Sequence, residues 1–265
     1  MPERLGQHFL IDPSVSQKII AALAPAPNDT VIEIGPGRGA LTLPLAERLA
    51  QLPEARLIAI ERDSALAAEV RETLGTKGLA ADIVDGDART VLPALAGTQG
   101  AYLLTGNLPY YLTGFFFRLL SELTLKPIRA VFMVQREVAE RMAATPPRMN
   151  LLAATLQHWT AVSLVATVPV SAFSPRPRVE GAIILLTPRR RKTEIPLYYT
   201  LVRALFKQPR KTIHNNLIAA APNLGIAGNG VDRALEGAGI IPGNRPHTLS
   251  LEAIERLAAR LSPHA

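Results

Sequence analysis

Five short apolar runs, rich in β-branched residues, recur through the first half of the chain with helical patterns between them. The runs cover residues 30–35, 56–61, 82–86, 101–106 and 129–135. Strands that alternate with helices in this way are typical of βαβ units and a parallel sheet. Two later runs, at 161–168 and 181–187, would add an edge hairpin. We therefore predict an α/β fold with a Rossmann-like, doubly wound sheet of about seven strands, most of them parallel.

Other segments complete the predicted architecture. Asp12-Pro13 is typical of an N-cap followed by proline at the first helical position, so a helix through Leu23 should precede the sheet, with a short arm before it. Asp63 likewise opens an amphipathic helical stretch. After residue 188 only helical patterns remain, at about 196–206, 210–220, 231–237 and 250–261. We predict a sheet domain over residues 1–188 and a small, basic, all-helical domain over 189–265.

The excess of positive over negative charge in this chain comes from one segment. Residues 189–220 hold eight Lys and Arg residues, including Lys207, Arg210 and Lys211, against a single acid, Glu194. The net charge of this segment is +7, which equals the formal net charge of the whole chain. Such a segment fits a phosphate-rich partner, because each neutralised phosphate releases counterions. On charge alone, a solvated helical face is an equal alternative.

The composition excludes several classes of site. With no cysteine, the chain can form neither disulfides nor thiolate metal sites, and its five scattered histidines show no metal-ligand spacing. No run approaches the ~18 apolar residues of a membrane span, and the N-terminus lacks the apolar core of a secretory signal. We expect a cytoplasmic protein without a metal or a membrane partner.

The segment from Val31 to Ala40 predicts a nucleotide-type cofactor site. It is a strand that runs into a glycine-rich turn and then a helix. Gly35 and Gly37 would let the turn reach positive φ and let a ligand approach the backbone, while the helix presents free N–H groups. Because the same segment satisfies the dinucleotide pattern G-x-G-x-x-A, it leaves a nicotinamide cofactor possible.

Three acidic residues lie near the expected site. Glu61 closes the second strand 26 residues after Gly35, where a carboxylate can accept hydrogen bonds from both ribose hydroxyls. Asp87, just after the third strand, could accept from the amine of an adenine, although an ordinary acidic turn is an equal interpretation. Two roles are open to Glu33: support of the loop, or binding of the cofactor's amino group.

The fourth strand ends at Asn107-Leu108-Pro109-Tyr110, a sequence that a dehydrogenase does not need. An adenine amine is a poor nucleophile because its lone pair is delocalised into the ring. Acceptors that favour a tetrahedral, positive nitrogen would assist its methylation by S-adenosylmethionine. Asn107 offers a side-chain oxygen, Pro109 can aim the carbonyl of Leu108, and Tyr110 offers a ring for stacking. An ordinary turn is the alternative, and we favour the catalytic interpretation.

A proline-spaced loop between the last two strands carries Phe173, Arg176 and Arg178. Phe173 could stack on the other face of an extruded base, with both arginines facing phosphates, or it could be a hydrophobic plug in a rigid turn. For the run Phe115-Phe116-Phe117 we favour the buried face of a helix over a base-stacking platform.

Taken in order, these motifs resemble the ribosomal RNA adenine dimethyltransferase family along nearly the whole chain. The matching segments are residues 6–10, 33–42, 61, 86–88, 107–110, 134–139, 173–179 and 206–212. The resemblance implies a class I methyltransferase fold in which His8 and Leu10 of the arm contact S-adenosylmethionine, together with Gly35, Gly37, Glu61, Asp87 and Asn107. It also implies catalysis by Asn107, Leu108, Tyr110 and Phe173, and RNA binding by Arg176, Arg178, Lys207, Arg210 and Lys211.

The resemblance further implies dimethylation of two adjacent adenosines in a hairpin near the 3′ end of small-subunit ribosomal RNA, within a pre-ribosomal particle. We expect the protein to be a monomer. Leu108 favours this branch over the related methyltransferases of macrolide resistance, which typically have Ile at that position. Those enzymes, and a ribosome assembly factor whose catalysis is dispensable, remain the alternatives.

Overall fold

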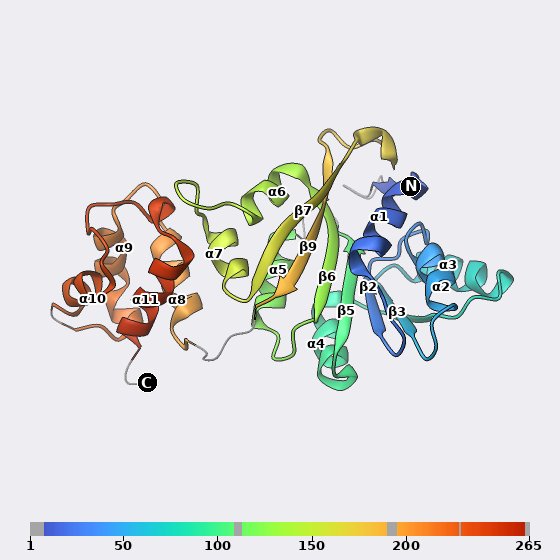
Figure 1. Cartoon of the computed structure of the whole chain (residues 1–265), viewed down its shortest axis with the longest axis horizontal. Coiled ribbons are helices and arrows are strands. Elements are labelled where there is room, and N and C mark those ends of the chain that lie inside the picture. The colour runs from blue at the N-terminus through green and yellow to red at the C-terminus, as the bar shows by residue number, and fades with distance from the viewer. Residues whose placement is uncertain (1–7, 109–112, 190–194, 228, 263–265) are drawn as a thin grey trace. The chain divides into compact units, whose positions relative to one another are not determined.

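The computed structural model describes residues 8–108, 113–189, 195–227 and 229–262 (Figure 1). The strands are β1 (Phe9–Leu10), β2 (Thr30–Ile34), β3 (Arg56–Glu61), β4 (Asp82–Asp85), β5 (Tyr102–Asn107), β6 (Arg129–Gln135), β7 (Thr160–Val168), β8 (Phe173–Ser174) and β9 (Gly181–Pro188). The α-helices are α1 (Pro13–Leu23), α2 (Thr42–Leu49), α3 (Ser64–Thr76), α4 (Ala88–Gln99), α5 (Thr113–Glu122), α6 (Arg136–Met142), α7 (Leu151–Gln157), α8 (Tyr198–Phe206), α9 (Ile213–Ala220), α10 (Gly230–Ala238) and α11 (Leu251–Leu261).

Seven strands form one sheet in the order β4-β3-β2-β5-β6-β9-β7. Strands β4, β3, β2, β5 and β6 pair in parallel, and β9 then runs antiparallel to β6. The order reverses beside β2, and such a reversal is where open α/β sheets bind their ligands, at the carboxyl ends of the strands. The prediction of a doubly wound, mostly parallel sheet is confirmed.

Helices α1, α2 and α3 supply the apolar residues that pack on one face of the sheet. Ile19 and Leu45 are fully buried there, in one cluster with Val31 of β2 and Leu103 of β5. Two acidic caps fix where these helices begin, as the sequence predicts. Asp12 accepts from the N–H of Ser14, and Asp63 accepts from the N–H groups that open α3.

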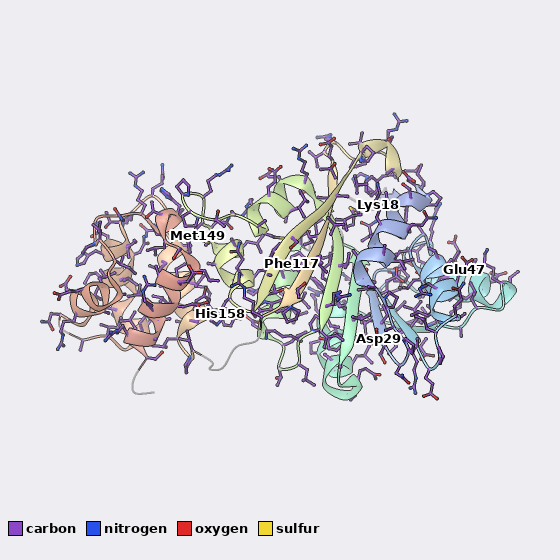
Figure 2. All side chains as sticks on the ribbon, in the orientation of Figure 1. Lys18, Asp29, Glu47, Phe117, Met149 and His158 are labelled. Atoms are coloured by element: carbon purple, nitrogen blue, oxygen red, sulfur yellow. The ribbon has the colours of Figure 1, made fainter. Side chains whose placement is uncertain are left out.

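Helix α5 packs on the opposite face. Phe132 of β6 alternates with residues of the first face, so its ring points away from α1. The rings of Phe116 and Phe117 meet it edge to face, at centroid distances of 5.4 Å each, and Figure 2 shows Phe117 inside this part of the molecule. The expectation that the whole run Phe115-Phe116-Phe117 is buried is wrong for Phe115, which is 40% exposed because it lies on the outer side of the helix.

A separate two-stranded sheet joins the N-terminal arm to the proline-spaced loop. Phe9 pairs with Ser174 and Leu10 with Phe173, in antiparallel register. The N–H of Ile11 extends the ladder by donating to the carbonyl of Ala172. The arm is therefore tied to a segment more than 160 residues away along the chain.

The chain forms two compact units. The sheet unit comprises Met1–Glu140 and Ala161–Pro188, and the helical unit comprises Arg141–Thr160 and Arg189–Ala265. The sequence predicted a single boundary at residue 188, which assigned residues 141–160 to the sheet domain. They group with the helical unit because Ala153 and Ala154 of α7 pack in its core.

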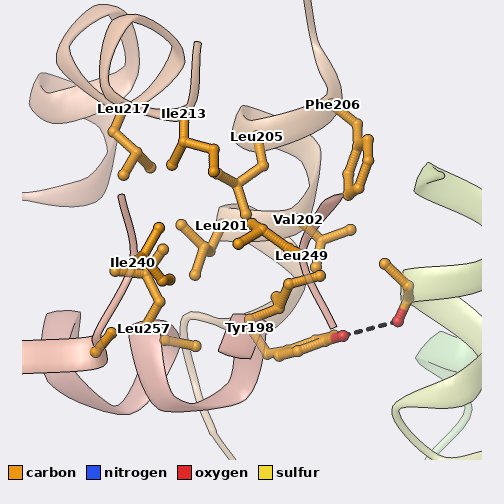
Figure 3. Packing of buried hydrophobic residues seen from close by; sticks show 14 of the residues in the cluster. Tyr198, Leu201, Val202, Leu205, Phe206, Ile213, Leu217, Ile240, Leu249 and Leu257 are labelled. Atoms are coloured by element: carbon orange, nitrogen blue, oxygen red, sulfur yellow. Dashed lines mark hydrogen bonds between the residues drawn. The ribbon is translucent and has the colours of Figure 1, made fainter. Parts of the chain in front are cut away.

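The core of the helical unit is formed by the apolar faces of α7 to α11 (Figure 3). Tyr198 is fully buried, and its hydroxyl donates to the carbonyl of Ala154 across 2.8 Å. A buried hydroxyl without an acceptor would be destabilising, so this bond fixes α8 against α7. None of the helices in the described part of the chain has the length and hydropathy needed to span a membrane.

Candidate functional site

A pocket opens in the sheet unit at the carboxyl ends of β2, β3, β5 and β6. Its walls combine the glycine loop after β2, the N-terminal arm, the end of β5, and apolar side chains from α1, β6 and β8. The lining combines the polar side chains of Glu33, Glu61 and Asn107 with apolar side chains such as Ile19, Met133 and Phe173. A ligand with charged, hydroxylated and apolar parts would suit such a lining.

The glycine loop has the backbone conformation that the sequence predicts. Gly35, Gly37 and Gly39 all have positive φ, at 68°, 57° and 82°. The N–H of Gly35 donates to the carbonyl of Ile60, which ties the loop to β3. Side chains are rarely found in this backbone region, so glycine keeps the turn unstrained while α2 begins beyond it. Gly35 and Gly37 both line the pocket, as expected of cofactor-binding residues.

Glu61 holds the glycine loop from the end of β3. One carboxylate oxygen accepts from the N–H of Gly37 at 3.1 Å, and the other accepts from the N–H of Asp63 at 2.9 Å. Burial raises the pKa of Glu61, and the N–H of Gly37 opposes this shift. Each oxygen has two lone pairs, so the carboxylate can still accept hydrogen bonds from the hydroxyls of a ribose.

Glu33 is the most deeply buried acid of the pocket, with 1% of its surface exposed. Burial raises its pKa to about 8. The hydroxyl of Thr42 opposes the shift, and the charge of Glu61 adds to it. Among the described residues, its Oε2 atom has no hydrogen-bond partner. An unpaired buried oxygen is costly, so a positively charged or N–H-bearing ligand group would be stabilised there.

The N-terminal arm closes the pocket beside the glycine loop. His8 and Leu10 line the pocket, and His8 also contacts the carbonyl of Pro175 through Nδ1 at 2.8 Å. The ring of Phe9 lies against Gly37, and the guanidinium of Arg38 is 4.8 Å from its centroid. Neither Phe9 nor Arg38 was predicted from the sequence as a site residue. Their only signal there was their position next to residues that the motifs had identified.

Asn107 ends β5 and lines the pocket. Its side-chain Nδ2 donates to the carbonyl of His8 at 3.4 Å, and no partner is recorded for its Oδ1 atom in the described part of the chain. Leu108, 2% exposed, donates its N–H to the carbonyl of Met133. The two residues are thus anchored through their donors, and no described residue donates to the oxygen of Asn107. The remaining predicted catalytic residue of this motif, Tyr110, lies outside the described residues, as does Pro109.

Asp87 is placed differently from the other predicted cofactor residues, because it does not line the pocket. It is the N-cap of α4, where it accepts from the N–H of Arg89. It also pairs with the guanidinium of Arg89 and lies 3.8 Å from that of Arg62. The hydrogen bonds from Arg89 hold the pKa of Asp87 below its ordinary value. The structure therefore gives Asp87 a capping role, which is compatible with an additional contact to a ligand amine.

Phe173 lines the pocket with only 1% of its surface exposed. Its ring belongs to the apolar cluster beneath the pocket, so it forms part of the wall. Arg176 and Arg178 of the same loop are exposed. Within the described residues neither arginine has a recorded ion pair, and both are accessible to an external anion.

The predicted RNA-binding residues of the helical unit lie in the loop between α8 and α9. Lys207, Arg210 and Lys211 are all exposed there. The residue that shapes this loop, Asn216, was not predicted from the sequence; it is 4% exposed. Its Nδ2 atom donates to three carbonyls of the loop, those of residues 208, 211 and 212. Its signal in the sequence is a polar residue on the otherwise apolar inner side of α9.

No group of histidine, cysteine or carboxylate side chains in the described ranges could hold a metal ion. The lining of the pocket has the features of an organic cofactor site. It offers glycine backbone, two buried carboxylates and an apolar wall, with an amide at its edge.

The chain is similar to known proteins along most of its length. The family model described as ribosomal RNA adenine dimethylase matches residues 2–230. Ribosomal RNA small subunit methyltransferase A of Acidobacterium capsulatum is 40% identical over 268 residues, which cover 96% of this chain and 89% of that protein.

Two solved structures share the fold over nearly their whole length. The crystal structure of a dimethyladenosine transferase from Plasmodium falciparum superimposes with a TM-score of 0.78 and 25% identity, over 94% of this chain and 96% of that one. The crystal structure of the 23S rRNA methyltransferase ErmE gives a TM-score of 0.72 and 25% identity, over 96% and 99%. The predicted class I methyltransferase fold is confirmed, and the chain belongs to the ribosomal RNA adenine dimethylase family.

Proposed function

We propose that this protein dimethylates the exocyclic amine of adenosines in small-subunit ribosomal RNA, with S-adenosylmethionine as methyl donor. The observation that carries the proposal is the position of Asn107, whose amide lines a cofactor-type pocket with its nitrogen bonded to His8 and with no described residue donating to its oxygen. Membership of the family removes the nicotinamide alternative for the glycine loop. The name of the relative from Acidobacterium capsulatum, ribosomal RNA small subunit methyltransferase A, supports a target in the small subunit.

The residues of the pocket fit the parts of S-adenosylmethionine. Glu33, with its unpaired buried oxygen, suits the amino group of the methionine moiety. Glu61 suits the ribose hydroxyls, and Gly35 and Gly37 let the ligand approach the backbone. His8 and Leu10 would cover the cofactor from the arm. Asp87 would reach its adenine amine while still capping α4.

The bound cofactor supplies an electrophilic methyl group on a sulfonium. An adenine amine held at Asn107 would gain a positive charge as it accepted this methyl group from the sulfonium, and it would then lose a proton to solvent. The oxygen of Asn107 and the carbonyl of Leu108 accept hydrogen bonds from the amine and so stabilise that charge. Phe173 forms an apolar wall, and Tyr110 would stack on the base. The attack needs no general base, because the amine becomes acidic only after the methyl group has moved.

Two basic segments would hold the RNA. Arg176 and Arg178 lie on the loop that forms one wall of the pocket, where they would bind phosphates next to the target base. Lys207, Arg210 and Lys211 form an exposed group on the helical unit. Such contacts position the RNA and make its binding dependent on salt.

Within small-subunit ribosomal RNA, the proposed target is a pair of adjacent adenosines in a hairpin near the 3′ end. The protein would act in the cytoplasm, as a monomer, on a pre-ribosomal particle. To test this, immature small subunits are incubated with the protein and labelled S-adenosylmethionine, and the digested RNA is separated into nucleosides. Dimethyladenosine at two neighbouring positions is the expected product. Cofactor binding without any such product would refute the proposal.

A further inference from the structure

Phe115 is an exposed aromatic residue surrounded by arginines, in the first turn of α5. It is 40% exposed, whereas Phe116 and Phe117 beside it are 4% and 0% exposed. The guanidinium of Arg118 lies 5.2 Å from the centroid of its ring, and that of Arg89 lies 6.0 Å away. Single apolar residues are common on protein surfaces, but Phe115 differs from them because two guanidinium groups lie near the face of its ring.

The cluster lies at the edge of the sheet that carries the proposed active site. Helix α5 follows β5, which ends at Asn107, and α4 follows β4, which ends beside Asp87. Parallel strands present their carboxyl ends at one edge, so the first turns of both helices belong to that edge. The contact between Arg89 and Phe115 joins these two first turns. An RNA that places a base at Asn107 must pass over this edge.

The two arginines of the cluster differ in how their guanidinium groups are held. Arg89 is held by Asp87 through both its Nε and its terminal nitrogen. Arg118 is exposed, and no ion pair is recorded for it in the described part of the chain. Arg118 can therefore leave the ring to pair with an external anion, while Arg89 remains in place. The result would be an open aromatic face next to a positive charge.

We propose that Phe115 and Arg118 form a second nucleotide site, which binds an unpaired nucleotide of the RNA beside the target adenosine. The base stacks on the exposed ring of Phe115, and the guanidinium of Arg118 pairs with its phosphate. Every base has a π-face, so stacking on an aromatic residue holds single-stranded nucleotides without selecting their sequence. This inference rests on the proposed function, because it assumes an RNA substrate.

The test compares variants that distinguish three contributions to RNA binding: the aromatic face of Phe115, its apolar volume, and the charge of Arg118. Phe115→Leu removes the aromatic face but keeps an apolar side chain, and Phe115→Tyr keeps the face. Arg118→Gln removes only the charge. Leu125→Ala is the matched control, because Leu125 is 43% exposed and follows α5 at the opposite edge of the sheet. The probe is a 3′ fragment of small-subunit ribosomal RNA that contains its terminal hairpin, and a fully paired duplex of equal length is the second probe.

Fluorescence anisotropy over a range of salt concentrations gives the affinity and the salt slope, and calorimetry gives the Kd of S-adenosylmethionine. Phe115→Leu should weaken binding of the hairpin fragment by about five- to tenfold with an unchanged salt slope, and should leave binding of the duplex unchanged. Phe115→Tyr and Leu125→Ala should bind as the unmodified protein does. Arg118→Gln should lower the salt slope by about 0.7, the value for one single-strand phosphate.

Hairpin affinity that Phe115→Leu leaves unchanged would overturn the inference. So would a loss of affinity for S-adenosylmethionine in place of RNA, since the cluster would then serve the cofactor. The methylation assay of the unmodified protein separates this result from a failure of the proposed function. If dimethyladenosine forms normally and the Phe115 variants bind RNA normally, only the second nucleotide site is refuted. If the unmodified protein binds the fragment but forms no dimethyladenosine, the proposed function fails whatever the variants do.

Discussion

The side chain of Asn107 donates to the backbone carbonyl of His8, 3.4 Å away, and so joins the end of β5 to the N-terminal arm. This bond orients the amide, because a planar side chain whose nitrogen is fixed has its oxygen fixed as well. The arm also contacts the glycine loop through Phe9 and the proline-spaced loop through His8. The arm therefore connects the proposed cofactor site with the proposed acceptor for the target amine.

The contribution of the arm can be measured at Phe9. Phe9→Ala removes the ring between Gly37 and Arg38, and we expect the Kd of S-adenosylmethionine to rise by about three- to tenfold. Ile11→Ala is the control, because Ile11 follows β1 and is 59% exposed. Calorimetry that gives the same Kd for Phe9→Ala and the unmodified protein would show that the arm does not support the cofactor site.

The buried carboxyl of Glu33 should make stability depend on pH. Its pKa is raised from 4.5 to about 8, so between these values the folded protein holds a proton that the unfolded chain has lost. The free energy of unfolding should therefore fall as pH rises through this window. Glu33→Gln keeps the shape without the titration, so it should flatten the fall in Tm of the cofactor-free protein between about pH 5 and 9.

The exposed Glu47 of α2 provides the matched control, and Glu47→Gln should leave the curve of Tm against pH unchanged. Parallel curves for Glu33→Gln and the unmodified protein would mean that Glu33 does not titrate as its burial requires.

Strand β5 approaches β2 closely at Gly106, which pairs with Ile34. A Cβ atom at Gly106 would lie 2.5 Å from the carbonyl oxygen of Ile34, so Gly106→Ala must force the two strands apart just before Asn107. We expect a loss of about 1–3 kcal/mol in the free energy of unfolding, measured by urea denaturation. Gly114→Ala is the control, since nothing lies within 4 Å of its Cβ position. Equal stabilities for the two variants would contradict the close packing.

The basic loop between α8 and α9 should act through charge. Reversal of Arg210 and Lys211 to Glu should weaken RNA binding and reduce the slope of log affinity against log salt by at least about 1.4, the contribution of two single-strand phosphates. The control reverses Lys77 and Arg56, two exposed cations at the amino edge of the sheet. A salt slope that the first variant leaves unchanged would exclude the loop as a phosphate contact.

The sequence predicted the features that depend on local pattern. Apolar runs located the seven strands of the main sheet, glycines located the turn at Gly35 and Gly37, and Asp12 and Asp63 were identified as caps. These features follow from periodicity and backbone freedom within a few residues.

The sequence could not reveal features that depend on distant contacts. The pairing of Leu10 with Phe173 joins two-residue strands, which are too short to give a pattern. The side of α5 on which Phe115 lies depends on how that helix is rotated against Phe132. The grouping of residues 141–160 with the helical unit depends on contacts of Ala154 with residues beyond 190.

The central claim is that Asn107 serves the methylation of adenine amines in ribosomal RNA. The most direct test is mass spectrometry of nucleosides from small-subunit ribosomal RNA of cells that have this protein, lack it, or carry Asn107→Ala. The account predicts dimethyladenosine with the unmodified protein, none without it, and a rate lowered about 10²- to 10³-fold by Asn107→Ala while RNA binding is retained. Dimethyladenosine formed at an undiminished rate by Asn107→Ala would contradict it.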